Sequence, residues 1–100
     1  MSTFDLTIVT PAGTRFDGPA ESLVAPGEAG FFGVLAHHAP MISGLKPGVL
    51  KVTTGEGDTF FAVAEGLLEV NMGNSVVVLA DEAKPSATAE EAEKKLAEIA

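Results

Sequence analysis

Short apolar runs alternate with turn signals along the chain from its start to about residue 80. Between Phe4 and Thr10, apolar side chains occupy every second position, which is the period of a β-strand with one buried face. Pro11 to Gly13 then form a turn, and Gly18-Pro19 predicts a second break. Repetition of this pattern predicts further strands over 14–17, 21–25, 31–35, 41–43, 49–54, 59–64, 67–71 and 75–79.

Strands this short, separated by turns rich in glycine and proline, are typical of sandwiches and barrels. We therefore predict a mainly β fold whose first part is an antiparallel β-sandwich of roughly eight to ten strands. The pattern changes after Ala80, where β-branched residues give way to alanine, glutamate and lysine. We expect the strands to end there, which predicts a sandwich domain over residues 1–84.

The remaining residues, 85–100, predict one short α-helix. Thr88 to Glu91 match a capping box, in which a threonine hydroxyl and a glutamate carboxylate satisfy free amides at a helix start. The apolar stripe of this helix comprises Ala89, Ala92, Leu96 and Ile99. The spacing also predicts the ion pairs Glu90–Lys94 and Glu91–Lys95. Because a helix of about twelve residues is marginal alone, its stripe is expected to pack on the sandwich or on a partner.

Charge and hydropathy then restrict the class of partner. Six basic residues against fourteen acidic residues give a net charge of −8, which repels nucleic acid and anionic lipid headgroups. We expect protein partners with basic patches and no nucleic acid. The apolar runs are far shorter than the ~20 residues of a membrane span, so no direct insertion into the bilayer is expected. The chain has no cysteine, and its first residues show no targeting leader.

The segment from Gly27 to Gly48 is unusually rich in glycine and proline and predicts a shaped surface loop between strands. Phe31 and Phe32 lie at its start. Consecutive strand residues face opposite ways, so one phenylalanine is expected to be exposed as an interface anchor, although both could be buried under a curled loop. The surrounding glycines lack the Lys-Ser/Thr of a phosphate-binding loop.

Few residues suggest catalysis. His37 and His38 are the only histidines, and neighbours on an extended backbone need a bend before both can hold one metal. Loop histidines are more often packing or hydrogen-bonding residues, and the adjacent carboxylates of Asp81 and Glu82 are more often solvated than an acid/base pair. We expect no catalytic residue, metal or cofactor. A metal protein or enzyme using the histidines is one alternative, and a free-standing binding module using the Phe31/His38 loop is another.

Six motifs, in this order, resemble the ε subunit of bacterial and chloroplast F-type ATP synthases, whose mitochondrial counterpart is called δ. They cover nearly the whole chain, and together they are specific. The shared motifs are Asp5-Leu-Thr-Ile-Val-Thr-Pro11, Gly27-Glu-Ala-Gly-Phe-Phe-Gly-Val-Leu35, His38-Ala-Pro40, Leu45-Lys-Pro-Gly48, Gly66-Leu-Leu-Glu-Val70 and Val76-Val-Val-Leu-Ala-Asp-Glu-Ala83.

The resemblance implies a ten-stranded sandwich in a non-catalytic rotor subunit, which links the γ subunit to the membrane c-ring and couples proton translocation to ATP synthesis. Thr10, His38 and Ser43 would then face γ. The loop facing the c-ring would consist of Glu28, Ala29, Gly30, Phe31, Phe32 and Gly33. The resemblance also implies a peripheral membrane protein on the cytoplasmic face of the bacterial plasma membrane, with the α and β subunits within reach of the C-terminal helix.

The sequence departs from the family pattern at four places. Phe31 stands where the family often has an acidic residue, and Ala36-His37 stand where it has Pro-Gly. Only the first helix of the family's C-terminal two-helix hairpin is present. Glu91 stands where the family's nucleotide-binding pattern has an arginine, and a glutamate repels phosphate. We therefore expect no nucleotide site and little inhibition of ATP hydrolysis by the C-terminus.

Overall fold

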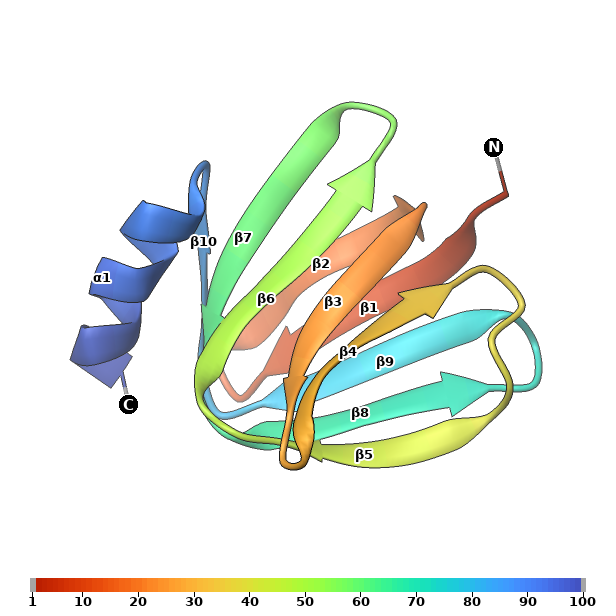
Figure 1. Ribbon diagram of the computed structural model, residues 1–100, viewed down its shortest axis with the longest axis horizontal. Helices are drawn as coiled ribbons and strands as arrows, with labels where there is room; N and C mark the ends of the chain where they lie inside the picture. Colours follow the sequence, from red (N-terminus) through yellow and green to blue (C-terminus); the bar gives the residue numbers. More distant parts are fainter. Residues whose placement is uncertain (1, 100) are drawn as a thin grey trace.

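A computed structural model describes residues 2–99, which form ten strands and one helix (Figure 1). The elements are β1 (Phe4–Thr10), β2 (Gly13–Ala20), β3 (Ser22–Gly27), β4 (Gly30–Leu35), β5 (Met41–Leu45), β6 (Gly48–Thr54), β7 (Gly57–Val63), β8 (Gly66–Asn71), β9 (Ser75–Ala80), β10 (Ala83–Ser86) and α1 (Ala89–Ile99). The predicted mainly β fold with one C-terminal helix is therefore confirmed.

The strands form one folded sheet with two walls. Its strand order is β10-β7-β6-β3-β5-β8-β9-β1-β2, with β4 paired to the other side of β3. The two walls meet where β3 and β5 pair at Gly27 and Leu45 alone. One wall thus contains β10, β7, β6, β3 and β4, and the other contains β5, β8, β9, β1 and β2 (Figure 1).

One strand pair departs from the predicted antiparallel arrangement. β1 and β9 run parallel, with Leu6 beside Val76 and Ile8 beside Val78, whereas the other strand pairs within residues 2–99 are antiparallel. These two strands lie far apart in the sequence. The turn signals in the sequence indicate only hairpins, which join neighbouring strands in antiparallel order. Parallel strands are joined by a long connection, so these signals do not predict the β1–β9 pair.

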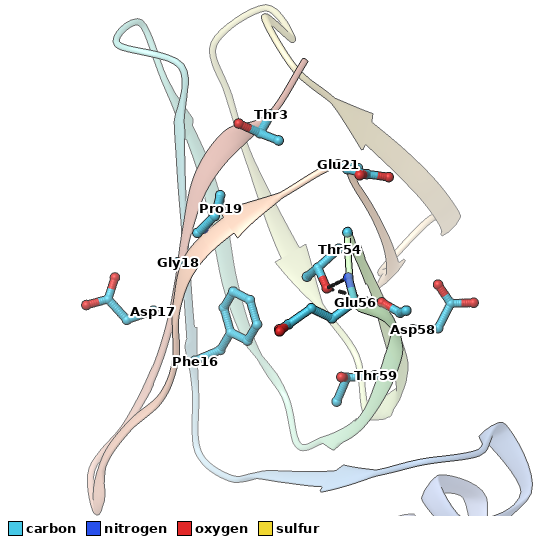
Figure 2. Close-up of a pocket in the computed structure, with 12 residues that line it drawn as sticks. Thr3, Phe16, Asp17, Gly18, Pro19, Glu21, Thr54, Glu56, Asp58 and Thr59 are labelled. Carbon is cyan, nitrogen blue, oxygen red and sulfur yellow. Dashed lines mark hydrogen bonds between the residues drawn. The ribbon is translucent and has the colours of Figure 1, made fainter. Parts of the chain in front are cut away.

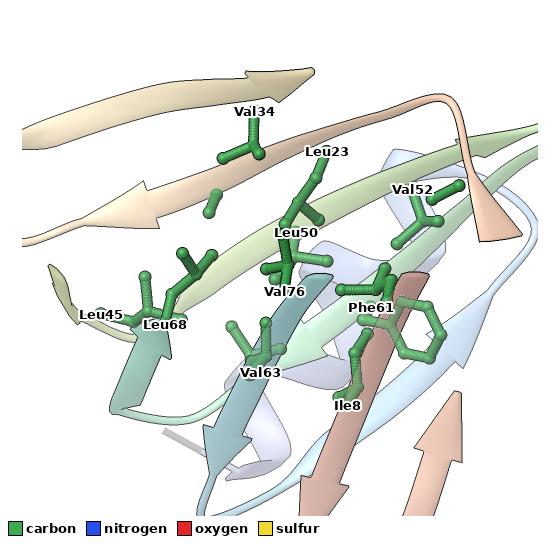
Figure 3. Packing of buried hydrophobic residues seen from close by; sticks show 14 of the residues in the cluster. Ile8, Leu23, Val34, Leu45, Leu50, Val52, Phe61, Val63, Leu68 and Val76 are labelled. Carbon is green, nitrogen blue, oxygen red and sulfur yellow. The ribbon is translucent and has the colours of Figure 1, made fainter. Parts of the chain in front are cut away.

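Alternating side chains of both walls fill the space between them (Figure 3). Leu6 and Ile8 of β1, Leu50 of β6, Phe61 of β7 and Leu68 of β8 are all less than 3% exposed. The period-2 pattern seen in the sequence explains this core, because successive strand residues point to opposite faces. Each of these large side chains contributes about 1.5–3 kcal/mol when it leaves water.

Three strand predictions were wrong, and each concerns a strand that contains a proline. Gly18-Pro19 does not break β2, Pro26-Gly27 belong to β3, and β10 follows the point where strands were expected to end. Pro19 and Pro85 lie in the strands at the two ends of the sheet path. Proline is tolerated in an edge strand, since no neighbour there needs its missing N–H donor.

Helix α1 begins with the threonine half of the predicted capping box, because the Glu91 amide donates to the Thr88 hydroxyl at 3.2 Å. Ala92 is buried and Leu96 and Ile99 are half-buried, so the helix lies on β6, β7 and β10 by part of the predicted stripe. Ala89 is exposed instead.

The predicted ion pairs of the helix are wrong, because neither Glu90–Lys94 nor Glu91–Lys95 forms within residues 2–99. The Lys95 ammonium instead donates to the Pro85 carbonyl at 2.7 Å, and Lys84 pairs with Glu98 at 3.5 Å. Both contacts connect the helix to β10.

Candidate functional site

The β3–β4 hairpin carries the loop predicted to face the c-ring. Glu28 and Ala29 form its exposed tip, and Gly30 begins β4 with φ +133°, a conformation that side chains other than glycine rarely adopt. The Glu28 amide donates to the Gly44 carbonyl at 3.1 Å, which fixes the tip against β5. Residues 30–33 therefore belong to a strand, and only the tip is a turn.

The two phenylalanines of this hairpin face opposite sides. Phe31 is 65% exposed, whereas Phe32 is half-buried and packs on the core. The prediction that one of them is exposed is confirmed. An exposed aromatic ring beside a constrained turn is a suitable interface anchor, since little conformational entropy is lost when such a ring is covered.

Two of the three residues predicted to face γ have inward side chains. Thr10 is 5% exposed, its hydroxyl donates to the Gly13 carbonyl at 3.2 Å, and it accepts from the Ala12 amide at 3.3 Å. Ser43 is half-buried and its hydroxyl donates to the Gly44 carbonyl at 3.1 Å. Both hydroxyls therefore form local hydrogen bonds. Side chains next to Thr10 and Ser43 along β1 and β5 point outward instead.

The third predicted residue, His38, lies in a loop that is held by Asn74. His37 has φ +64°, which supplies the bend missing from an extended backbone, and its amide donates to the Asn74 side-chain oxygen at 2.7 Å. The Asn74 side-chain nitrogen donates to the Thr3 carbonyl at 2.9 Å. His38 Nδ1 lies 2.6 Å from the Ala39 carbonyl oxygen, so this nitrogen carries a proton. The loop is thus fixed to the β8–β9 turn and the chain start.

Thr10 and His38 lie at opposite ends of the β5-β8-β9-β1 wall rather than in one cluster. β1 ends at Thr10, whereas the His38 loop borders the β8–β9 turn, beside a shallow hollow of about 210 Å³ lined also by Met72. Between these ends lies an outward apolar face, which we call the apolar wall. Its exposed large side chains are Ile42 of β5, Leu67 of β8 and Leu79 of β9.

Strand register brings the apolar wall together. Leu67 lies directly opposite Leu79 across β8 and β9, and Leu79 lies beside Val9 across the parallel pair. Ile42 lies opposite Glu69, and Asp5 of β1 is a second charged side chain on this face. The sequence analysis missed this surface because the register of β5, β8, β9 and β1 is a tertiary property. One signal was present: Ser75 to Ala80 are apolar at nearly every position, which is typical of a strand covered on both faces.

A larger hollow of about 530 Å³ opens between β2 and the β6–β7 hairpin (Figure 2). Phe16 points into it and Glu56 extends toward it, and among the described residues its rim carries acidic side chains and no basic one. The Arg15 and Glu82 side chains lie 3.5 Å apart and connect β2 to the β9–β10 connection. We call this boundary between β2 and the opposite wall the seam. None of the residues predicted to bind γ or the c-ring lines this hollow.

The described residues contain no assembled catalytic or metal centre. Within residues 2–99, no group of three histidine, cysteine or carboxylate side chains could hold a metal ion. Asp81 and Glu82 line an open hollow of about 400 Å³, where Glu82 accepts from the Ala83 amide at 3.0 Å and pairs with Arg15 at 3.5 Å. In the same range, no helix is long and apolar enough to span a membrane.

Comparison with known proteins identifies the family. Residues 3–86 match the model of the ATP synthase delta/epsilon chain β-sandwich domain. The ATP synthase epsilon chain of Acidithiobacillus ferridurans is 39% identical over 90 residues, which are 90% of this chain and 63% of that relative. The epsilon chain of Bordetella parapertussis is 43% identical over 93 residues, covering 92% of this chain and 66% of that relative.

Solved structures agree with this fold. A chain in the Euglena gracilis mitochondrial ATP synthase, solved as an assembly of OSCP, F1 and c-ring, superposes with a TM-score of 0.80 at 25% identity, covering 98% of this chain and 64% of that chain. A chain of the Tetrahymena thermophila central stalk and c-ring shares the fold at 19% identity, with a TM-score of 0.65 over 80% of this chain and 64% of that one. This chain therefore belongs to the family of ATP synthase delta/epsilon chains and carries their β-sandwich domain.

Proposed function

We propose that this chain is a non-catalytic rotor component of an F-type ATP synthase, in which the sandwich links the γ subunit to the c-ring and so couples proton translocation to ATP synthesis. Family membership supports the complex, and the Euglena neighbour comes from an assembly that contains F1 and the c-ring. In a bacterial cell like those of the epsilon-chain relatives, the protein would be peripheral to the cytoplasmic face of the plasma membrane.

The apolar wall is the observation that carries the γ assignment. Ile42 is 67% exposed, Leu79 49% and Leu67 40%, on a sheet face that lies between the predicted positions Thr10 and His38. Exposed apolar side chains that share one sheet face mark a surface used for protein contacts. The three predicted residues would act from the borders of this face, with His38 as the polar side chain that can reach a partner.

The hairpin tip is the corresponding candidate for the c-ring. Glu28 and Ala29 are exposed at the tip, Phe31 is exposed beside it on β4, and the hydrogen bond from the Glu28 amide to the Gly44 carbonyl of β5 holds the tip in place. A stiff tip transmits force without deforming, which suits a rotor contact. An aromatic ring at position 31 would make the contact more apolar than the acidic residue that the family often has there.

We propose no nucleotide-binding site at the C-terminal helix. Glu91 is exposed at the first turn of α1, where a carboxylate stabilises the helix start but repels a phosphate. We therefore expect little C-terminal inhibition of ATP hydrolysis by this chain. The exposed side of α1 stays available for a contact with the α and β subunits.

Complex formation with purified γ from the same source tests the proposal. Light scattering after size-exclusion chromatography is expected to show a one-to-one complex at micromolar concentration. Leu79→Asp should weaken it roughly a hundredfold, since a charge in the centre of an apolar interface costs 2 kcal/mol or more. Val24→Asp is the matched control, because Val24 is 38% exposed on the outer face of the other wall.

Two separate peaks from folded wild-type chain and folded γ would contradict the γ assignment and favour the free-standing binding module. The c-ring assignment has its own test. Phe31→Asp is expected to reduce proton-driven ATP synthesis by the reconstituted complex while the isolated domain stays folded and still binds γ. Unchanged coupling would show that Phe31 does not contact the c-ring.

A further inference from the structure

Strand β4 has an unpaired edge of unusual composition. It pairs with β3 on one side, and its other edge pairs with no strand within residues 2–99. From Gly30 to Ala36 the chain contains no charged residue and no proline. Phe31 and Leu35, on the outer face of this strand, are each 65% exposed. Long apolar edges with none of the usual protective residues are sites at which another strand adds.

The sequence of β4 is complementary to itself. When two copies of Gly30–Leu35 run antiparallel about an axis through Gly33, Phe31 of each copy lies opposite Leu35 of the other on the outer face. On the inner face, Phe32 lies opposite Val34. Aromatic–aliphatic pairs of this kind are the favourable cross-strand contacts of antiparallel sheets, and glycine at the centre permits close approach.

We propose that the free chain forms a symmetric dimer in which β4 pairs with β4 of a second copy, with Gly33 on the two-fold axis. The contact is isologous and closed, so it yields a dimer rather than a fibre. It covers Phe31 and Leu35 while no other partner is present. The proposal concerns the chain by itself and does not depend on a role in the ATP synthase.

The net charge of the chain opposes this dimer, so the dependence of dimerisation on salt concentration is diagnostic. Each copy carries a net charge of −8, whereas the paired strand segments carry none. Salt screens the repulsion between the copies and leaves the apolar contact intact. The dimer should therefore tighten as salt is added, opposite to an association held by ion pairs.

Oxidative cross-linking tests the geometry, because the chain has no cysteine of its own. A Cβ at Gly33 meets only the Leu23 carbonyl oxygen, at 3.8 Å, so Gly33→Cys fits the fold. Opposed residues in an antiparallel pair lie about 4.5–5.5 Å apart at Cα, within the range that a disulfide spans. Gly18→Cys is the matched control, since this β2 edge position also has room for a Cβ and no positive φ.

Gly33→Cys is expected to form a disulfide dimer at least roughly tenfold faster than Gly18→Cys, because pairing raises the local thiol concentration. Equal rates for the two variants would overturn the proposal.

Sedimentation equilibrium supplies a second measurement on the cysteine-free chain. Leu35→Lys should weaken the dimer roughly tenfold or more, because two symmetric Phe31–Leu35 pairs are lost. Met72→Lys is the control, since Met72 is 91% exposed on the β8–β9 turn, outside β4. A wild-type chain that stays monomeric up to about 1 mM would also overturn the proposal.

Discussion

The two walls of the sandwich have strands of different composition at their opposite edges. On one side, β2 carries Arg15, Asp17 and Pro19, and β10 carries Lys84 and Pro85 and lies under α1. On the other side, β4 and β5 contain neither charge nor proline. We call these the protected side and the unprotected side.

This difference shows which side of the fold is expected to stay free. Charges and prolines on an edge prevent further strand pairing, whereas an apolar edge without them is normally covered. The exposed Phe31, Leu35 and Ile42 all belong to the unprotected side. Partner contacts are therefore expected there and on the neighbouring apolar wall, and the acidic hollow of the protected side is expected to remain in solvent.

The largest effect is expected at the core of the protected side. Phe61 is 2% exposed and its ring meets that of Phe16 edge-on, with centroids 6.3 Å apart. Phe61→Ala should lower the free energy of unfolding by about 3–5 kcal/mol, through lost burial and a cavity. Phe31→Ala, on the unprotected side, should change it by less than about 0.5–1 kcal/mol. Urea denaturation measures both, and similar losses would show that Phe31 contributes to the fold.

Removing the charge and the proline from the edge of β2 should allow two copies of the chain to associate through this edge. Asp17→Val with Pro19→Val converts the centre of this edge into an apolar strand. Made in a Leu35→Lys background, the double change should strengthen self-association roughly tenfold, as judged by sedimentation. If the variant associates no more than its parent, the charges and proline are not what keeps this edge free.

A smaller gain in stability is expected at the end of β10. Ser86 is 7% exposed, and its hydroxyl is a buried polar group without a hydrogen-bond partner in the described part of the chain. Ser86→Ala should raise the free energy of unfolding by about 1 kcal/mol, since an unpaired buried hydroxyl is costly. Thermal or urea unfolding measures this gain. A loss instead would mean that a bound water satisfies the hydroxyl.

The smallest effect is expected for the ion pair that closes the seam of the protected side. The Arg15 and Glu82 side chains lie 3.5 Å apart and are each about one third exposed. Arg15→Met keeps most of the apolar stem and should cost only about 0.5 kcal/mol. The cost should vanish in high salt. A loss that persists in about 1 M salt would assign the effect to packing, because charges at that concentration are screened within a few ångströms.

Local patterns were sufficient to predict most of the fold. Alternation predicted β1 and β6 to β9, and the capping threonine predicted the start of α1. β10 was missed because Ala83 to Ser86 have few strand-forming residues and are held as a strand by pairing with β7. Pro19 was misread as a break because a sequence does not show which strands become edges.

The candidate site was predicted only in part. Exposure of one phenylalanine in the Phe31–Phe32 pair followed from strand geometry. The inward side chain of Thr10 and the outward faces of Leu67 and Leu79 depend on register between distant strands. The positive φ of His37 depends on Asn74, which is thirty-seven positions away. Residues that meet only through tertiary pairing leave no local signal.

Hydrogen exchange of the chain, free and bound to γ, tests most directly the claim that the unprotected side and the apolar wall form the partner surface. The account predicts that γ slows amide exchange in β5, β8 and β9 and leaves β2, β10 and the β6–β7 turn unchanged. Slower exchange at β2 and around the acidic hollow, with β5, β8 and β9 unaffected, would contradict it.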